Sequence, residues 1–297
     1  MSLQFIIGNS GAGKSHLAYE RIIRESMEHP EILYYIIVPE QFTMQTQKDV
    51  VEMHPGKGIL NIDILSFERL AYRVFEEVGG DNRKLLEDTG KSMVLQKLVQ
   101  SHVKELPYLG SQMKKPGYLD EVKSLLSEFM QYDIRQEELE EMLEKSRQQA
   151  LLHMKLHDVG VLYQAFREYL EGHYMTGEEV MDVLLKVLPF SEKLKNSVLL
   201  LDGFTGFTPV QNKVLGEMMR FCRKVIVTVT MDAREDPYVL EDKYRLFALS
   251  KQMVTSLVRI AGEGKVWIED PVCLYDRPVY RFRQNLALAH LEAELFR

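Results

Sequence analysis

Residues 8–15 read Gly8-Asn9-Ser10-Gly11-Ala12-Gly13-Lys14-Ser15 and match the phosphate-loop pattern G-x-x-x-x-G-K-[ST]. Glycines let the backbone turn so that successive N–H groups point at an anion. Lys14 supplies an ammonium group for the β- and γ-phosphates of a nucleotide, and the Ser15 hydroxyl is a ligand for Mg²⁺. All eight residues are therefore candidate contacts of ATP with Mg²⁺, and the stretch predicts a P-loop α/β fold.

The residues on either side decide between a phosphate loop and a chance match in a glycine-containing turn. A phosphate loop follows a buried strand and opens a helix. Leu3–Ile7 is an apolar run typical of a buried strand, and a helical pattern extends from Lys14 to about Glu28. The positive end of that helix dipole would point at the same anion. This context favours nucleotide binding.

Strand patterns alternate with helical patterns near both ends of the chain. Early strands are expected at Ile32–Val38 and Asn61–Leu65, followed by a helix over Phe67–Val78. Later strands are expected at Ser197–Leu201, Val225–Thr230 and Val266–Ile268, with helices over Pro209–Arg220 and Tyr244–Ala261. Such alternation is typical of βαβ units and predicts a parallel sheet.

The middle of the chain has a different pattern. From Leu85 to Leu188 the segments are amphipathic helices without a convincing strand; Leu95, Leu98 and Val99, for example, form one apolar stripe. Thr176-Gly-Glu-Glu179 resembles a capping box that opens a helix over Val180–Leu188. We therefore expect residues 1–84 and 196–297 to form one α/β lobe, interrupted by an all-helical insertion over residues 85–195.

Composition limits the class of protein. The chain has 297 residues, of which 45% are hydrophobic and 27% charged, as in ordinary globular proteins. Its net charge of −7 means that any nucleic acid must be contacted through a local groove. Cys222 and Cys273 are too few for a four-thiolate cluster and fit a reduced cytosol. No apolar run approaches the ~20 residues of a membrane span, so we expect a cytoplasmic protein without a membrane partner.

A candidate metal carboxylate follows the strand pattern at Val198–Leu201. A phosphate loop needs an acidic residue at the end of a neighbouring strand to hold the metal, and Asp202 takes that position. The alternative is an aspartate that begins a turn with Gly203. With the intact loop upstream, Ser15 and Asp202 are the predicted Mg²⁺ residues.

Gly203 occupies the position where hydrolysing ATPases of the helicase type carry a glutamate that polarises the attacking water. Glycine has no side chain to act as a base. No catalytic residue can therefore be assigned, and slow hydrolysis of ATP is expected.

Two segments resemble superfamily 1 helicases of the UvrD type. The run from Asp202 to Gln211 is similar to their motif II, D-E-F-Q-D-T-x-x-x-Q, although Gly203 and Thr205 to Phe207 depart from it. Gln211 also fits a local alternative, a capping box that starts at Thr208. Leu65–Ala71 is similar to a DNA-contacting segment, with Glu68 in place of histidine.

That second resemblance makes Ser66 and Phe67 candidate DNA contacts. The alternative is that Ser66 caps a helix and Phe67 packs inward. Arg281 and Arg283 form a small basic cluster that would suit a DNA backbone, with ordinary surface solubility as the alternative.

The phosphate loop, Val38–Gln41, Leu65–Ala71 and Leu200–Phe204 together resemble the AddB family, the second subunits of bacterial AddAB ATP-dependent helicase–nucleases. The resemblance implies a RecA-like helicase lobe with a helical 1B-type insertion and a degenerate motor. It also implies an AddA-type partner subunit, DNA ends as substrate and a role in recombination repair of double-strand breaks. ATP and Mg²⁺ are the expected cofactors. The chain reads as an N-terminal fragment, so the family's iron–sulfur cluster is expected only in the C-terminal part of the parent protein.

Three classes of function remain open at this point. The first is the degenerate helicase-like subunit. The second is a self-sufficient P-loop phosphotransferase of the nucleotide-kinase type, which would need arginines converging on the phosphates after a glycine-rich hinge; none is visible. The third is a scaffold lobe in which the loop binds phosphate incidentally. The resemblance favours the first.

Overall fold

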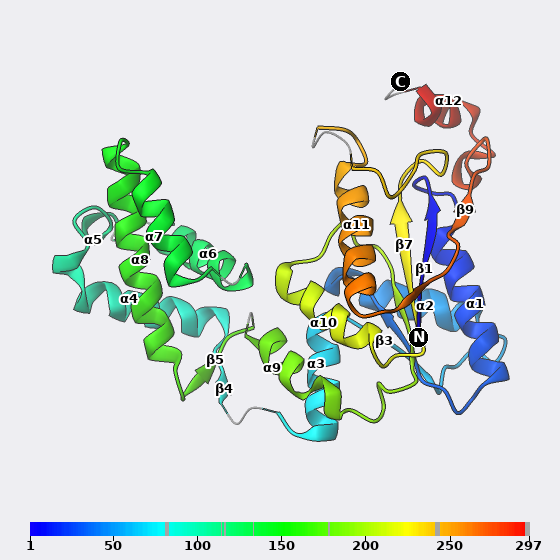
Figure 1. Ribbon diagram of the computed structural model, residues 1–297, viewed down its shortest axis with the longest axis horizontal. Helices are drawn as coiled ribbons and strands as arrows, with labels where there is room; N and C mark the ends of the chain where they lie inside the picture. The colour runs from blue at the N-terminus through cyan, green and yellow to red at the C-terminus, as the bar shows by residue number, and fades with distance from the viewer. Residues whose placement is uncertain are drawn as a thin grey trace. The chain divides into compact units, whose positions relative to one another are not determined.

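The computed structural model describes residues 1–80, 83–113, 115, 117–132, 134–177, 179–240 and 244–294. It divides into two compact units (Figure 1). Unit 1 comprises Met1–Gly79, Leu184–Phe207 and Gln211–Arg297, and unit 2 comprises Gly80–Val183 and Thr208–Val210.

A parallel sheet forms the centre of unit 1. Its strands are β1(Ser2–Gly8), β2(Tyr34–Ile37), β3(Ile62–Leu65), β6(Val198–Leu201), β7(Lys224–Thr230), β8(Trp267–Ile268) and β9(Val272–Leu274). The order is β3-β2-β6-β7-β1-β8, and β9 pairs with β1 further along the same strand. Every pairing described in this sheet is parallel, which confirms the predicted fold class.

Helices cover both faces of this sheet. The helices of the α/β part are α1(Lys14–Glu28), α2(Thr43–Met53), α3(Phe67–Val78), α10(Pro209–Met219), α11(Ala248–Glu263) and α12(Leu286–Glu294). In Figure 1, α1 and α2 lie on one face, and α10 and α11 lie on the other. Ile6, Ile22 and Leu200 are fully buried between the sheet and the first of these layers. Burial of both faces explains why the inner strands β2 and β6 are continuous apolar runs rather than alternating patterns.

Strand register brings the predicted site residues to one edge of the sheet. Gly8 pairs with Thr230, and Leu201 pairs with Ile37 on one side and Val227 on the other. In a parallel sheet the carboxyl ends of the strands share an edge, where ligands bind. The phosphate loop after β1 and Asp202 after β6 therefore emerge at the same edge, on either side of β7.

The helix α3 shows how local sequence fixes an element's ends. The Ser66 hydroxyl accepts a hydrogen bond from the Arg69 N–H at 3.3 Å and caps the helix. Gly79, with a φ of 82°, ends it. The predicted range Phe67–Val78 is confirmed.

Unit 2 is mainly helical. Its helices are α4(Asp88–Ser101), α5(Leu109–Gln112), α6(Tyr118–Gln131), α7(Gln136–Lys145) and α8(Ala150–Leu170), and the chain leaves it through α9(Val180–Val187). Leu95, Leu98, Val99, Leu162 and Phe166 contribute to its core. Across the described residues, no helix combines the length and apolar character needed to cross a bilayer.

The prediction of no strand between Leu85 and Leu188 is wrong in detail. Two short strands, β4(Lys84–Leu85) and β5(Tyr174–Met175), pair in parallel. A two-residue strand is too short to show any periodicity, so the sequence carries no signal for it. The capping box at Thr176 is present, because its N–H and the Glu179 carboxylate are 3.0 Å apart.

Several boundaries and elements in unit 1 also differ from the predictions. The second strand begins at Tyr34 rather than Ile32, and α11 begins at Ala248 rather than Tyr244. The elements α2, β9 and α12 were not predicted. In α2 only Thr43, Thr46 and Val50 are buried, so its apolar stripe is too thin to recognise.

Candidate nucleotide site

The phosphate loop presents backbone donors that have no protein partner. Gly11 and Gly13 have φ values of 81° and 95°, which side-chain-bearing residues rarely adopt. Within the described residues, the N–H groups of Ser10, Gly11 and Gly13 donate to no other protein group, whereas the Ala12 N–H donates to the Asn9 carbonyl at 3.1 Å. No side chain caps the start of α1. Such unpaired donors at a helix N-terminus suit a phosphate anion.

Lys14 lies within the loop rather than in solvent. It is 8% exposed, and Nζ donates to the carbonyl oxygens of Gly8 and Asn9, both at 3.0 Å. Burial lowers the pKa of Lys14 to about 8; the Asp202 carboxylate opposes this shift, and the Arg281 guanidinium adds to it. At pH 7 most of the lysine is therefore still charged, and its ammonium group is held by two carbonyl oxygens of the loop.

Asp202 forms the other half of the site and is 6% exposed. Its Oδ1 accepts hydrogen bonds from Ser15 Oγ at 3.0 Å and from Thr228 Oγ1 at 2.5 Å, and its Oδ2 accepts one from Tyr19 Oη at 2.6 Å. Three hydroxyl groups from α1 and β7 thus fix both oxygens of one carboxylate. The structure brings Ser15 and Asp202 together, and their role as Mg²⁺ residues stays a prediction.

The side-chain oxygen atoms of Ser15 and Asp202 are of the chemical type that binds Mg²⁺. Mg²⁺ is usually held by one or two protein oxygen ligands together with substrate phosphates and water, not by an all-protein cage. Among the residues that the structure describes, no group of three or more histidine, cysteine or acidic side chains forms such a cage. Ser15 and Asp202 beside a phosphate loop match the first arrangement.

Tyr19 and Thr228 belong to the site but were not predicted from the sequence. Tyr19 follows Ser15 by four residues on α1, so the two side chains lie on one face of the helix, and this spacing was an available signal. Burial, the Asp202 charge and the hydrogen bond to Asp202 raise the pKa of Tyr19 well above its usual range. Tyr19 therefore remains a hydrogen-bond donor. Thr228 is a hydroxyl within the otherwise apolar core of β7.

Gly203 follows Asp202 in a conformation that favours glycine. Its φ is 81°, and a Cβ built on it would lie 3.6 Å from Pro39 Cδ and 3.9 Å from a ring carbon of Phe42. There is room for a side chain, but the backbone conformation strains one. That no catalytic base stands at this position stays a prediction.

Ser66 and Phe67 have local structural roles. Ser66 caps α3 and Phe67 is 6% exposed. The Phe67 ring packs edge-on against the rings of Phe204 and Phe207, with centroids 5.7 Å and 6.1 Å apart. The alternative interpretation, a helix cap with an inward phenylalanine, describes both residues. A DNA contact at this position stays a prediction.

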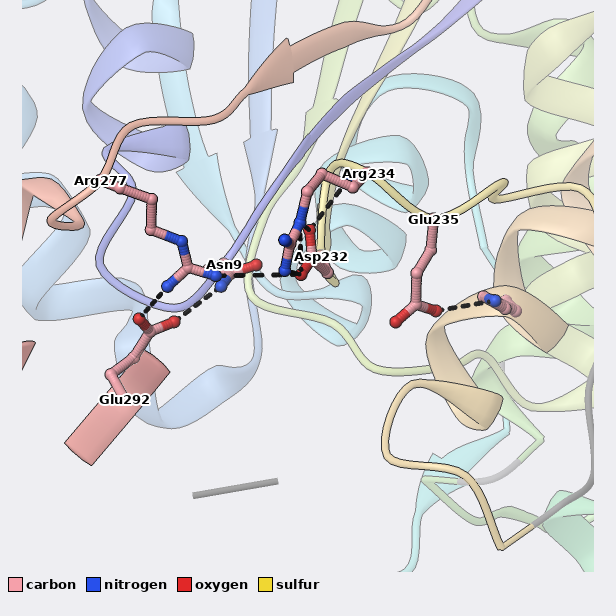
Figure 2. Close-up of polar contacts among 7 residues, drawn as sticks. Asn9, Asp232, Arg234, Glu235, Arg277 and Glu292 are labelled. Atoms are coloured by element: carbon pink, nitrogen blue, oxygen red, sulfur yellow. Dashed lines mark hydrogen bonds and ion pairs between the residues drawn. The ribbon is translucent and has the colours of Figure 1, made fainter. Parts of the chain in front are cut away.

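A chain of polar contacts joins the loop to the C-terminal segment and to the end of β7 (Figure 2). Asn9 Nδ2 donates to Glu292 Oε1 at 2.6 Å, and Arg277 donates to Glu292 Oε2 at 2.5 Å. Arg277 Nη2 also lies 3.9 Å from Asp232 Oδ2, which accepts a 2.6 Å hydrogen bond from Arg234. These contacts place α12 beside the first residues of the loop.

A cavity of about 820 Å³ borders this network. Its wall includes Asn9 and Ser10 of the loop and Thr230 at the end of β7. The volume lies in the range of small-molecule sites. Lys14, Ser15 and Asp202 do not line it, so the cavity adjoins the predicted phosphate and metal positions without including them.

The chain matches one protein-family model and relatives that all carry the same name. A family model described as "ADDB, N-terminal" matches residues 5–292. The B-type subunit of an ATP-dependent helicase/deoxyribonuclease from Lachnoclostridium phytofermentans is 46% identical over 300 residues, covering 100% of this chain and 26% of the relative. Proteins of the same name from Clostridium kluyveri and Thermoanaerobacter sp. are 34% and 33% identical, covering 100% of this chain and 26% and 25% of the relatives.

This chain therefore spans about a quarter of the length of these relatives. The family match extends over both units and includes the phosphate loop, Asp202 and Arg281. With the fold, the loop geometry and these identities together, the chain belongs to the AddB N-terminal family.

Proposed function

We propose that this chain is the helicase-like, nucleotide-binding portion of the AddB-type subunit of an ATP-dependent helicase/deoxyribonuclease that acts at double-strand DNA ends in recombination repair. Gly8–Ser15 would hold the phosphates of ATP, and Ser15 with Asp202 would hold Mg²⁺. The 3.0 Å hydrogen bond between Ser15 and Asp202 carries the proposal. It joins the first turn of α1 to the end of β6 and brings together the pair of oxygen groups that a P-loop metal site requires.

We propose different roles for two parts of the chain. We assign residues 1–84 and 196–297 to a RecA-like lobe and residues 85–195 to a helical insertion of the 1B type. The lobe carries the parallel sheet and all residues of the nucleotide site. The insertion has its own apolar core.

Binding without rapid turnover follows from the residues after β6. Bound Mg²⁺ would neutralise phosphate charge, but attack by water also needs a positioned base. Gly203 provides none, and its conformation disfavours a replacement. An arginine finger from a second lobe would also be needed for fast hydrolysis. We therefore infer a nucleotide-sensing or structural role in a complex whose partner drives translocation.

Titration calorimetry with ATP, in Mg²⁺ and in EDTA, tests this function. We expect binding heat with ATP–Mg²⁺, weaker binding in EDTA, and little phosphate release from the same samples. Absence of nucleotide-dependent heat would contradict the proposal and favour a scaffold lobe. Phosphate transfer to a small acceptor would favour a phosphotransferase instead.

Changing Gly203→Glu should not by itself create an active ATPase. A glutamate would supply the missing carboxylate, but a φ of 81° strains any side-chain-bearing residue by about 1 kcal/mol. We expect slightly lower thermal stability and unchanged phosphate release, measured against Gly203→Ala as the matched backbone control. A large rise in phosphate release by the glutamate variant alone, or fast hydrolysis by the unmodified chain, would show that the account of Gly203 is wrong.

ATP affinity should fall as the pH rises above about 8. The pKa of Lys14 is about 8, set by burial and by the facing charges of Asp202 and Arg281. The protonated ammonium pairs with phosphate and the neutral amine does not, so affinity is retained below that pH and lost above it. Calorimetry above that pH should show the ATP affinity falling by up to about tenfold for each pH unit. In Lys14→Arg, which stays charged, an equal decline would contradict the assignment.

Partners and further cofactors are part of the same proposal. We infer an AddA-type helicase–nuclease subunit, DNA ends and a cytoplasmic location. An iron–sulfur cluster would be held by other parts of the parent protein. Cys222 is buried, and burial raises the pKa of its thiol to about 12, so it suits the core rather than a cluster. Copurification of the chain with the partner subunit would support the assignment, and a chain that binds neither partner nor DNA ends would contradict it.

A further inference from the structure

Arg281 lies directly over the phosphate loop. Its backbone N–H donates to the Gly11 carbonyl at 3.1 Å. A Cβ built on Gly11 would lie 2.7 Å from Arg281 Cβ and 3.3 Å from Nε of the guanidinium. The side chain therefore packs on Gly11, and the absence of a Cβ at position 11 makes this approach possible. From the sequence alone, Arg281 was a candidate only for the surface or for a DNA backbone.

The segment that carries Arg281 is anchored on both sides of this contact. Arg277 precedes it and Glu292 follows it, and Glu292 is bonded both to Arg277 and to Asn9 of the loop (Figure 2). The short turn η4(Tyr280–Phe282) sets Arg281 between these anchors. Anchoring on both sides, together with the backbone hydrogen bond to Gly11, fixes the position of the Arg281 backbone relative to the loop.

Arg281 and Arg283 differ in their surroundings although only one residue separates them. Arg283 forms an ion pair with Asp276 at 2.6 Å and lies over the ring of Tyr280 at 5.1 Å. For the Arg281 guanidinium, the described part of the chain offers no carboxylate within ion-pair distance. The Arg281 side chain is exposed, so its charge remains available to an anion from solution.

We propose that Arg281 is a second cation of the phosphate site and contacts the terminal phosphates of a nucleoside triphosphate held by the loop. This inference rests on the proposed nucleotide binding. Lys14 would approach the phosphates from within the loop, and Arg281 would approach from the segment packed on Gly11. The guanidinium can donate two parallel hydrogen bonds to phosphate oxygens, which an ammonium group cannot match in geometry.

The two arginines provide a matched pair of variants. Arg281→Ala should weaken ATP binding about tenfold, as expected for loss of a charge-assisted hydrogen bond to phosphate. Arg283→Ala removes the same charge two residues away and should leave ATP affinity within about twofold of the unmodified chain. Arg281→Lys should recover part of the loss, because the charge returns without the bidentate geometry. Both sites are exposed, so thermal unfolding should confirm that all three variants are folded.

Calorimetry with ATP and with ADP, alongside single-stranded DNA binding, separates the outcomes. The proposal predicts a larger loss for ATP than for ADP in Arg281→Ala, since the terminal phosphate carries the contact. Equal ATP affinity in Arg281→Ala and the unmodified chain would overturn it. So would weakened DNA binding with unchanged ATP affinity, which would assign Arg281 to a nucleic-acid backbone. If the unmodified chain binds no ATP, the proposed function itself fails, and the two failures are distinguishable.

Discussion

Lys14→Ala should weaken ATP binding by about 100-fold, the largest functional effect expected of any single substitution here. The variant removes an ammonium group that is held at 3.0 Å from two loop carbonyls and adjoins the phosphate position. Charge-assisted hydrogen bonds to phosphate are worth more than neutral ones, and about 100-fold corresponds to about 2.7 kcal/mol. Titration calorimetry at pH 7 with ATP–Mg²⁺ measures the change.

Two control measurements separate loss of the phosphate contact from loss of the folded structure. Lys14→Arg retains the charge and should bind ATP more tightly than Lys14→Ala. Thermal unfolding of Lys14→Ala should be close to that of the unmodified chain, because the substitution removes a buried charge as well as its hydrogen bonds. Equal ATP affinity in the alanine variant and the unmodified chain would show that Lys14 of the loop does not bind the phosphates of ATP.

Asp202→Ala should cause the largest loss of stability among the site variants, about 3 kcal/mol in the free energy of unfolding. The carboxylate accepts hydrogen bonds from Ser15, Tyr19 and Thr228. Removing it leaves three hydroxyl groups around a buried space without their common acceptor. The same variant should lose the Mg²⁺ dependence of ATP binding. Urea unfolding and calorimetry with and without Mg²⁺ measure the two effects.

Asp202→Asn separates these two effects. The amide has the shape of the carboxylate, and hydroxyl groups can rotate to donate to its oxygen or accept from its nitrogen. We expect a stability loss of about 1 kcal/mol and the same loss of Mg²⁺ dependence, because the negative charge is gone. If the asparagine variant kept the full Mg²⁺ dependence of the unmodified chain, Asp202 would not be a metal residue.

The central fold was predictable because its signals are local and strong. Leu3–Ile7 is apolar except for Gln4, and the loop and helix that follow it have residue types with few alternative uses. Ser66 and Gly79 bracket α3, so the cap and the stop were both visible in the sequence. The order of strands in the sheet was not predictable, since it depends on crossovers between distant segments.

The missed elements have weak or short patterns. Val272–Leu274 forms a three-residue edge strand in which Cys273 is exposed, so it lacks the apolar run of β1. The helix α12 has no buried residue, and its position is set by Glu292 and Arg277 rather than by an apolar face. Polar contacts between distant segments leave no periodic trace in a sequence.

The candidate site could be predicted only where its residues belong to sequence motifs. Ser15 and Asp202 belong to motifs with a chemical logic, and the structure places them 3.0 Å apart. Tyr19 and Thr228 support Asp202 through tertiary packing of α1 against β7, and Arg281 reaches the loop from a segment about 270 residues away in sequence. Such partners become visible only when the fold is known.

The most direct test of the central claim is a crystal structure of the chain with ATP and Mn²⁺, using the anomalous signal of manganese to locate the cation. We expect a triphosphate surrounded by the N–H groups of Gly8–Ser15 and a manganese peak between Ser15 and Asp202. We also expect intact ATP, because Gly203 supplies no base. A loop without nucleotide, with Lys14 still bonded to Gly8 and Asn9 and no peak at Asp202, would contradict it.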